Sequence, residues 1–240
     1  MSTTTLRQDC RAQPVPEATD LVLHTEPVGE ETEAWEDVNG TAMFTCHYKA
    51  VQEPPRATLV LVHGFGEHCM RYVAVCRTFA SQGIEVLTYD QRGFGRTGRK
   101  NNQMGVTRGI QQLQRDMTFM NRRVRRAATA SQPAIPHFVL GHSMGGMEVL
   151  SYILQCPEET AELITGAIVT SSAIQLAPDA QPNPVMRIIS KVASTLFKSV
   201  TIRRPLNLER LSRDPAVGQA VRHDEYYYLI GSLQCRKYPQ

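Results

Sequence analysis

The chain of 240 residues lacks the patterns that mark several classes of protein. Its six cysteines are scattered without a C-x-x-C pair, so neither a zinc site nor a dense disulfide framework is indicated, and reduced thiols are expected. The N-terminus has no apolar core of a signal peptide, and no apolar run has the length of a membrane span. A net charge of +3 with 20% charged residues is too balanced for a nucleic-acid binder. We therefore expect a cytoplasmic protein that could touch a membrane only from outside.

Strand-like and helix-like segments alternate through the middle of the chain. Residues 1–32 are polar and contain proline, which predicts a flexible N-terminal tail. Apolar, β-branched runs then follow at Thr58–His63 (TLVLVH) and Ile84–Asp90 (IEVLTYD), with a shorter one from His137 (HFVLG). Each is followed by a segment with apolar residues at helical spacing. Runs that are apolar throughout are typical of strands buried on both faces, so the pattern predicts an α/β fold around a mostly parallel sheet.

The last third of the chain changes in character. A further strand is predicted in ITGAIVTSSA, from Ile164, and would close the core that we place at residues 33–172. Residues 173–240 have helical periodicity and no β-rich run, and we interpret them as a helical cap. Without later strands, the strand from Ile164 would be an edge with poorly covered faces, which predicts low solubility or self-association.

A serine motif sits where a predicted strand meets a predicted helix. In Gly141-His142-Ser143-Met144-Gly145 the glycines flank Ser143 and permit the sharp strand-to-helix turn of a nucleophile elbow. The N–H of Met144 would lie at the N-terminus of the following helix, where the dipole favours a developing oxyanion. We expect Ser143 to be a nucleophile and Met144 to supply one oxyanion donor.

A glycine-rich loop follows the earlier buried strand. In His63–His68, HGFGEH, the glycines let the backbone approach a substrate and leave the N–H of Phe65 free to donate. We expect Phe65 to supply the second oxyanion donor. The alternative is a turn whose glycines only relieve strain.

A third glycine pattern suggests different chemistry. Gly93, Gly95 and Gly98 satisfy G-x-G-x-x-G after a strand, with Asp116 at about the distance of a ribose contact in dinucleotide-binding folds. However, three residues intervene before Gly93, and the segment is expected to be a polar loop with no helix starting directly after Gly98. A nucleotide-dependent oxidoreductase is therefore kept only as an alternative class.

Taken in order, LVHGFGEH, YDQRGFGRTG and LGHSMGG resemble the three signatures of the monoacylglycerol lipase and lysophospholipase branch of the serine aminopeptidase-like α/β-hydrolases. The likeness runs from about Trp35 to the end, and LERLSRDPAV resembles the cap of that family. The resemblance implies a nucleophile at Ser143, an oxyanion hole from Phe65 and Met144, and long-chain monoacylglycerol or lysophospholipid esters as substrates. It implies no metal and no organic cofactor.

The acid and histidine of a triad are missing from this pattern. In this fold they follow the serine in the order Asp or Glu, then His, yet the family's motifs for both are absent and the chain ends near the cap. His223 is the sole histidine after Ser143, and its neighbour Asp224 would point about 100° away on a helix. We interpret both as polar residues of the cap surface. The remaining aspartates after Ser143 are Asp179 and Asp214.

Histidines near the motifs are not assigned as the base, because His63, His68 and His142 precede or flank the serine and match motif positions. Two interpretations stay open: a truncated form of a serine hydrolase, or a lipid-binding or interaction protein that has lost the triad.

One stretch of the cap supports a lipid ligand. In Asn183–Val200 apolar residues fall on one face and cations on the other, and the predicted substrate or lid residues are Ile188, Ile189, Val192 and Leu196. Such a helix could cover an acyl pocket, rest on an anionic membrane or lipid-droplet surface, or simply pack on the core.

Overall fold

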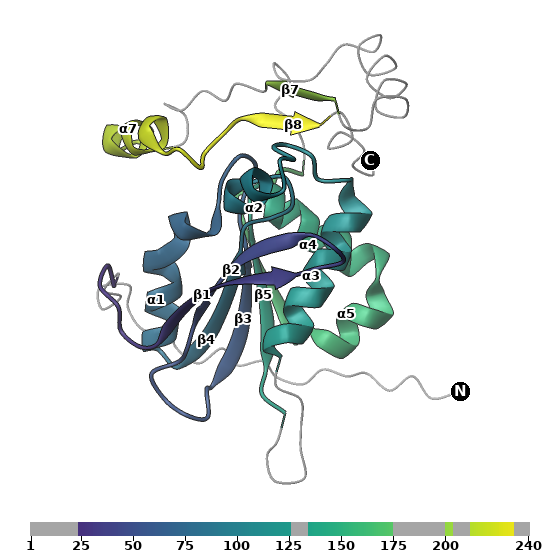
Figure 1. Cartoon of the computed structure of the whole chain (residues 1–240). Coiled ribbons are helices and arrows are strands. Elements are labelled where there is room, and N and C mark those ends of the chain that lie inside the picture. Colours follow the sequence, from purple (N-terminus) through teal and green to yellow (C-terminus); the bar gives the residue numbers. More distant parts are fainter. Residues whose placement is uncertain (1–23, 126–133, 175–199, 204–211, 233–240) are drawn as a thin grey trace.

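A six-stranded mixed sheet forms the centre of the protein (Figure 1). The computed structural model describes residues 24–125, 134–174, 200–203 and 212–232. The strand order is β1-β2-β4-β3-β5-β6. The strands are β1 (Glu31–Asp37), β2 (Ala42–Tyr48), β3 (Ala57–Val62), β4 (Ile84–Tyr89), β5 (His137–His142) and β6 (Gly166–Thr170). The pairs formed by β1, β2 and β4 are antiparallel, whereas β4, β3, β5 and β6 run parallel. The predicted α/β fold with a mostly parallel sheet is confirmed.

Helices cover both faces of this sheet (Figure 1). The short 3-10 helix η2 (Cys69–Tyr72) leads into α1 (Val73–Ser81) on one face. On the other face lie α3 (Ile110–Val124), α4 (Met144–Gln155) and α5 (Pro157–Leu163). Val60 and Val62 of β3 join the cluster beneath α3 and α4, while Leu59 and Leu61 join the cluster beneath α1. Because β3 is buried on both faces, its residues are apolar except for Thr58, whose hydroxyl is hydrogen-bonded to His137.

The first strand of the sheet, β1, was not predicted. The sequence ETEAWED of β1 is mostly acidic and has little intrinsic strand propensity, but it pairs with β2 over its whole length. Trp35 packs edge-on against Phe44 of β2, with 5.4 Å between the ring centroids. This strand also begins inside the residues that were expected to form the tail.

The predicted polar loop after Gly93 contains a helix, α2 (Gly95–Lys100), so that prediction was wrong. Two glycines in its six residues give this segment a low intrinsic helix propensity. Tertiary contacts stabilise the helix instead: Asp90 Oδ2 accepts a hydrogen bond from Arg96 N at 2.6 Å, and Thr97 Oγ1 accepts one from Phe44 N at 2.9 Å.

The described part of the cap region also contains strands, contrary to prediction. β7 (Thr201–Arg203) and β8 (Ile230–Ser232) form an antiparallel pair, and α7 (Pro215–His223) precedes β8. Strands of three residues are too short for period-two alternation to be recognised. The predicted amphipathic helix and its lid residues Ile188, Ile189, Val192 and Leu196 lie outside the described residues.

The predicted edge position of the strand after Ile164 is confirmed. β6 pairs with β5 alone in the described sheet, and Ile168 on it is 40% exposed. Separately, none of the helices in the described ranges has the length and apolar character needed to span a membrane.

Candidate active site

Ser143 lies in the turn that joins β5 to α4. Its φ of 54° and ψ of −113° place a non-glycine residue in a left-handed region, which costs on the order of 1–3 kcal/mol. The flanking glycines allow the turn because a Cβ on Gly145 would collide with the carbonyl of Val62, and one on Gly141 with that of Gly145. The local geometry is that of the elbow expected from the sequence.

Hydrogen bonds fix the backbone of this turn. Ser143 N donates to Thr170 O of β6 at 2.9 Å, and Ser143 O accepts from Met147 N at 3.1 Å and from Ala173 N at 3.0 Å. Met144 is the first residue of α4, so its N–H belongs to the helix N-terminus, which carries positive partial charge. Among the described residues, no side chain hydrogen-bonds to the Ser143 hydroxyl.

The loop His63–His68, here called the glycine loop, follows β3 and reaches the same place. A Cβ built on Gly64 would lie 3.2 Å from Ser143 Cβ and 2.9 Å from Glu67 Oε2. The structure therefore brings the two motifs together, with the Glu67 carboxylate beside them. Glu67 Oε2 accepts hydrogen bonds from Gly64 N at 2.9 Å and from the Tyr72 hydroxyl at 2.5 Å.

Phe65 occupies the middle of the glycine loop. Its ring packs edge-on against Phe94, with 5.4 Å between centroids. The next residue, Gly66, has a φ of +76°, and its carbonyl accepts a hydrogen bond from Tyr228 N at 3.0 Å. Phe65 thus lies between two residues whose backbone groups are held.

The histidines of the core motifs have partners other than the serine. His63 is fully buried, its Nδ1 donates to Gly64 O at 2.8 Å, and its Nε2 accepts from Gln91 N at 2.9 Å. This pairing requires a neutral ring, and burial lowers the pKa of His63 accordingly. His142 Nδ1 lies 3.0 Å from Thr170 Oγ1, and His68 Nε2 donates to Asp224 Oδ2 at 2.8 Å.

Asp224 is not the exposed cap residue that was predicted. It follows the last residue of α7, and its carboxylate pairs with both His68 and Arg71 of the core. Burial raises the pKa of Asp224, but the hydrogen bond and charge of His68, together with hydrogen bonds from Tyr226 N and Arg71, hold the pKa below its usual 3.8. His223 is exposed, as expected. His68 and Asp224 are 156 residues apart, so no sequence spacing signals the pair.

The dinucleotide alternative is contradicted by the geometry. Asp116 forms a two-point ion pair with Arg92, at 2.8 and 2.9 Å, and both side chains are 1% exposed, so neither can reach a ribose. A Cβ on Gly93 would lie 2.8 Å from Val106 N, and one on Gly98 would meet the Tyr228 hydroxyl. The glycines serve close packing of the chain. In the described ranges no three His, Cys, Asp or Glu side chains are arranged to hold a metal ion.

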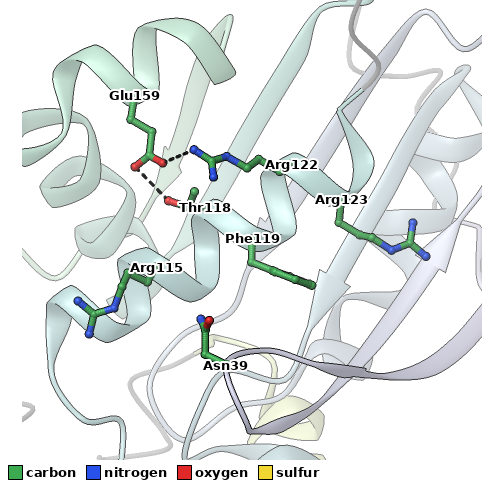
Figure 2. Close-up of a pocket in the computed structure, with 7 residues that line it drawn as sticks. All are labelled: Asn39, Arg115, Thr118, Phe119, Arg122, Arg123 and Glu159. Carbon is green, nitrogen blue, oxygen red and sulfur yellow. Dashed lines mark hydrogen bonds and ion pairs between the residues drawn. The ribbon is translucent and has the colours of Figure 1, made fainter.

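A surface hollow lies elsewhere, beside α3 and α5 (Figure 2). It has a volume of about 590 Å³ and is lined by Asn39, Arg115, Thr118, Phe119, Arg122, Arg123 and Glu159. None of these residues belongs to the elbow or to the glycine loop. Glu159 neutralises Arg122 across it at 2.9 Å, so we do not treat this hollow as the active site.

A serine elbow above a mostly parallel sheet, faced by a glycine loop after the neighbouring strand, defines an α/β-hydrolase. Residues 53–236 match the family described as "Serine aminopeptidase, S33", and the chain belongs to that family. Within it, the chain is similar to the monoacylglycerol lipases.

Individual relatives show how far the similarity extends. A monoacylglycerol lipase from Mycolicibacterium smegmatis is 34% identical over 170 residues, which cover 71% of this chain and 56% of the relative. The phospholipase YtpA of Bacillus subtilis is 27% identical over 173 residues, covering 72% and 61%. The crystal structure of a soluble variant of Saccharomyces cerevisiae monoglyceride lipase, in complex with a substrate analog, superposes with a TM-score of 0.71 at 27% identity, covering 84% of this chain and 64% of that one. This chain spans little more than half the length of these two curated relatives.

Proposed function

We propose that the protein is a serine ester hydrolase that acts on monoacylglycerol or lysophospholipid-type lipid esters through an acyl-enzyme on Ser143. The observation that carries this proposal is the close approach of Gly64 to Ser143 on its strained elbow. The substrate class is supported by relatives that are named as a monoacylglycerol lipase and a phospholipase.

The proposed reaction uses the backbone geometry of both motifs. Ser143 Oγ bonds to the ester carbonyl carbon, and the carbonyl electron pair moves onto its oxygen. The N–H groups of Phe65 and Met144 stabilise this oxyanion, and each such donor is worth roughly 10²–10³ in turnover. The alcohol then leaves with the proton of the serine, and water releases the fatty acid from Ser143.

A specific observation favours a second candidate. No described histidine hydrogen-bonds to Ser143, and a serine hydroxyl without a general base is a weak nucleophile. The second candidate is a lipid-binding or interaction protein that keeps the elbow and the glycine loop and does not turn over esters.

Intact-mass labelling with a fluorophosphonate separates the two candidates. We expect a single adduct on the purified chain and none on Ser143→Ala. Ser151→Ala is the matched control, because Ser151 lies on α4, the helix that follows Ser143, is 8% exposed and accepts a hydrogen bond from Gln114, so its loss should leave labelling intact. A folded wild-type sample that takes no label would contradict the hydrolase and support the second candidate.

Fatty-acid release then tests the substrate class. We expect turnover of a long-chain monoacylglycerol or lysophosphatidylcholine and none of an aminoacyl anilide. Turnover of the anilide alone would assign the chain to the peptidase chemistry in the family's description.

A further inference from the structure

The segment Asp224–Tyr228, here called the tyrosine segment, contacts the glycine loop from the cap side. Asp224 Oδ2 lies 2.8 Å from His68 Nε2 at the end of the loop, and Tyr228 N donates to Gly66 O at 3.0 Å. The tyrosine segment thus holds the loop at a backbone carbonyl and at a side chain. Asp224 is also connected indirectly to Gly64, at the start of the loop.

Arg71 provides that connection. Its Nη1 is 3.4 Å from Asp224 Oδ2, and its Nε is 3.6 Å from Glu67 Oε1. The other oxygen of Glu67 accepts the hydrogen bond from Gly64 N. The charges of Asp224, Arg71 and Glu67 therefore alternate in a line that ends at the backbone N–H of Gly64. These side chains are 16–20% exposed, so solvent screens their interactions only in part.

Aromatic contacts fasten the tyrosine segment to α2. The Tyr226 ring lies under Arg96, with 4.2 Å from the guanidinium carbon to the ring centroid, and under Arg99 at 4.8 Å. The Tyr228 hydroxyl is 3.2 Å from Gly93 O and 3.1 Å from Gly95 O. Its ring stacks on Phe94, the residue against which Phe65 packs. The segment is thus anchored independently of the loop that it contacts.

From these contacts we infer that docking of the tyrosine segment fixes the backbone of the glycine loop, with Asp224 and Arg71 as positioning residues that hold the Phe65 N–H toward the Ser143 site. This inference rests on the proposed function, because it assigns Phe65 the oxyanion role. A loop with two glycines samples many backbone conformations when it is free. A donor stabilises a transition state best when it is already fixed before charge develops.

Amide hydrogen exchange followed by NMR tests the coupling without requiring turnover. Asp224→Asn should speed exchange about tenfold or more at Tyr228, whose N–H is bonded to Gly66 O, and at Glu67, whose N–H is bonded to Gly64 O, because one charged hydrogen-bond partner of the loop is lost. Glu225→Gln is the matched control: this neighbouring acid pairs only with Arg99 in the described structure, at 3.1 Å, and is exposed. It should leave loop exchange within about twofold of wild type. Equal loop exchange in the two variants would overturn the inference.

Faster exchange at the core strand β3 in Asp224→Asn would mean that the variant destabilises the whole protein. A second variant is designed for that case. Arg71→Gln removes the cation between Asp224 and Glu67 while leaving the Asp224–His68 contact in place. It should speed amide exchange at Gly64 and leave amide exchange in β3 unchanged. Unchanged exchange at Gly64 in Arg71→Gln would equally overturn the inference.

Kinetics separate this inference from the proposed function. With a monoacylglycerol, Asp224→Asn should lower kcat about tenfold and leave KM unchanged, because the oxyanion contact forms only in the transition state. Glu225→Gln should preserve both constants. A wild-type protein that neither labels nor turns over would refute the hydrolase, while the exchange data would still decide the coupling. A loosened loop with unaltered kcat would refute the positioning role.

Discussion

Replacing Glu148 should stabilise the protein, and increasingly so as the pH rises. Glu148 lies on α4 just beyond the serine elbow, is 0% exposed, and neither of its carboxylate oxygens has a hydrogen-bond partner in the described structure. Burial raises its pKa well above 4.5, and the nearby charge of Asp116 raises it further. The folded protein therefore keeps this side chain protonated at pH values where the unfolded chain has already lost the proton.

The sign of the effect follows from proton binding in the two states. Below about pH 4.5 both states hold the proton, so ionisation of Glu148 costs nothing. As the pH rises toward the raised pKa, the unfolded state loses its proton and the folded state does not. The free energy of unfolding should fall by about 1.4 kcal/mol for each pH unit in this window because of this one site.

Urea unfolding of wild type and Glu148→Met at pH 5, 6, 7 and 8 measures this cost. The stability difference should favour the variant by about 1–3 kcal/mol at the acid end, where a neutral unpaired carboxyl is removed, and should widen with pH. Glu148→Gln should remove the pH trend while keeping an unpaired polar group. The buried, neutral His63 also makes stability depend on pH, but it does so equally in each variant and cancels.

Glu162→Gln provides the baseline, since Glu162 is an exposed acid on α5 and its loss should shift stability by less than about 0.5 kcal/mol at every pH. A difference between wild type and Glu148→Met that stays constant from pH 5 to pH 8 would refute the reasoning.

Two further predictions concern other parts of the chain. Asp116→Asn leaves the Arg92 guanidinium buried without its carboxylate and should lower the free energy of unfolding, measured with urea, by about 3–5 kcal/mol. Glu36→Gln, which breaks an exposed pair with Arg123, should lower it by about 1 kcal/mol or less. Equal losses of stability in the two variants would contradict this prediction. The double variant Lys191→Glu/Lys198→Glu should sediment less with anionic liposomes than wild type and equally with neutral ones, because the sequence predicts these cations opposite an apolar face. Equal sedimentation with anionic liposomes would argue against membrane contact.

The parts of the fold that could be predicted from the sequence are those determined locally. β3 is predictable because every residue from Ala57 to Val62 is buried, and all of them except Thr58 are apolar. The turn at Ser143 is predictable because Gly141 and Gly145 lie within contact distance of other backbone, where a side chain would not fit. This requirement produces a recognisable motif of five consecutive residues, Gly141 to Gly145.

Elements that depend on partners outside their own sequence could not be predicted. β1 forms because β2 pairs with it, and α2 forms because Asp90 and Phe44 contact its first turn, so their own sequences carry little signal. The pairing of Asp224 with His68 crosses 156 residues and joins residue types that are common on surfaces. For the same reason the glycine loop was predictable as a loop, and its attachment to the tyrosine segment was not.

The place of β3 in the sheet also governs the order in which the chain can fold. Its two neighbours are β4, which follows closely, and β5, whose His137 aligns with Thr58 across 79 residues. A ribosome adds 5–20 residues per second, so one backbone edge of β3 stays unpaired for on the order of ten seconds during synthesis. Pairing over such separations is slow even in the complete chain. The strand that carries the glycine loop is therefore expected to stay incompletely paired until β5 has been synthesised.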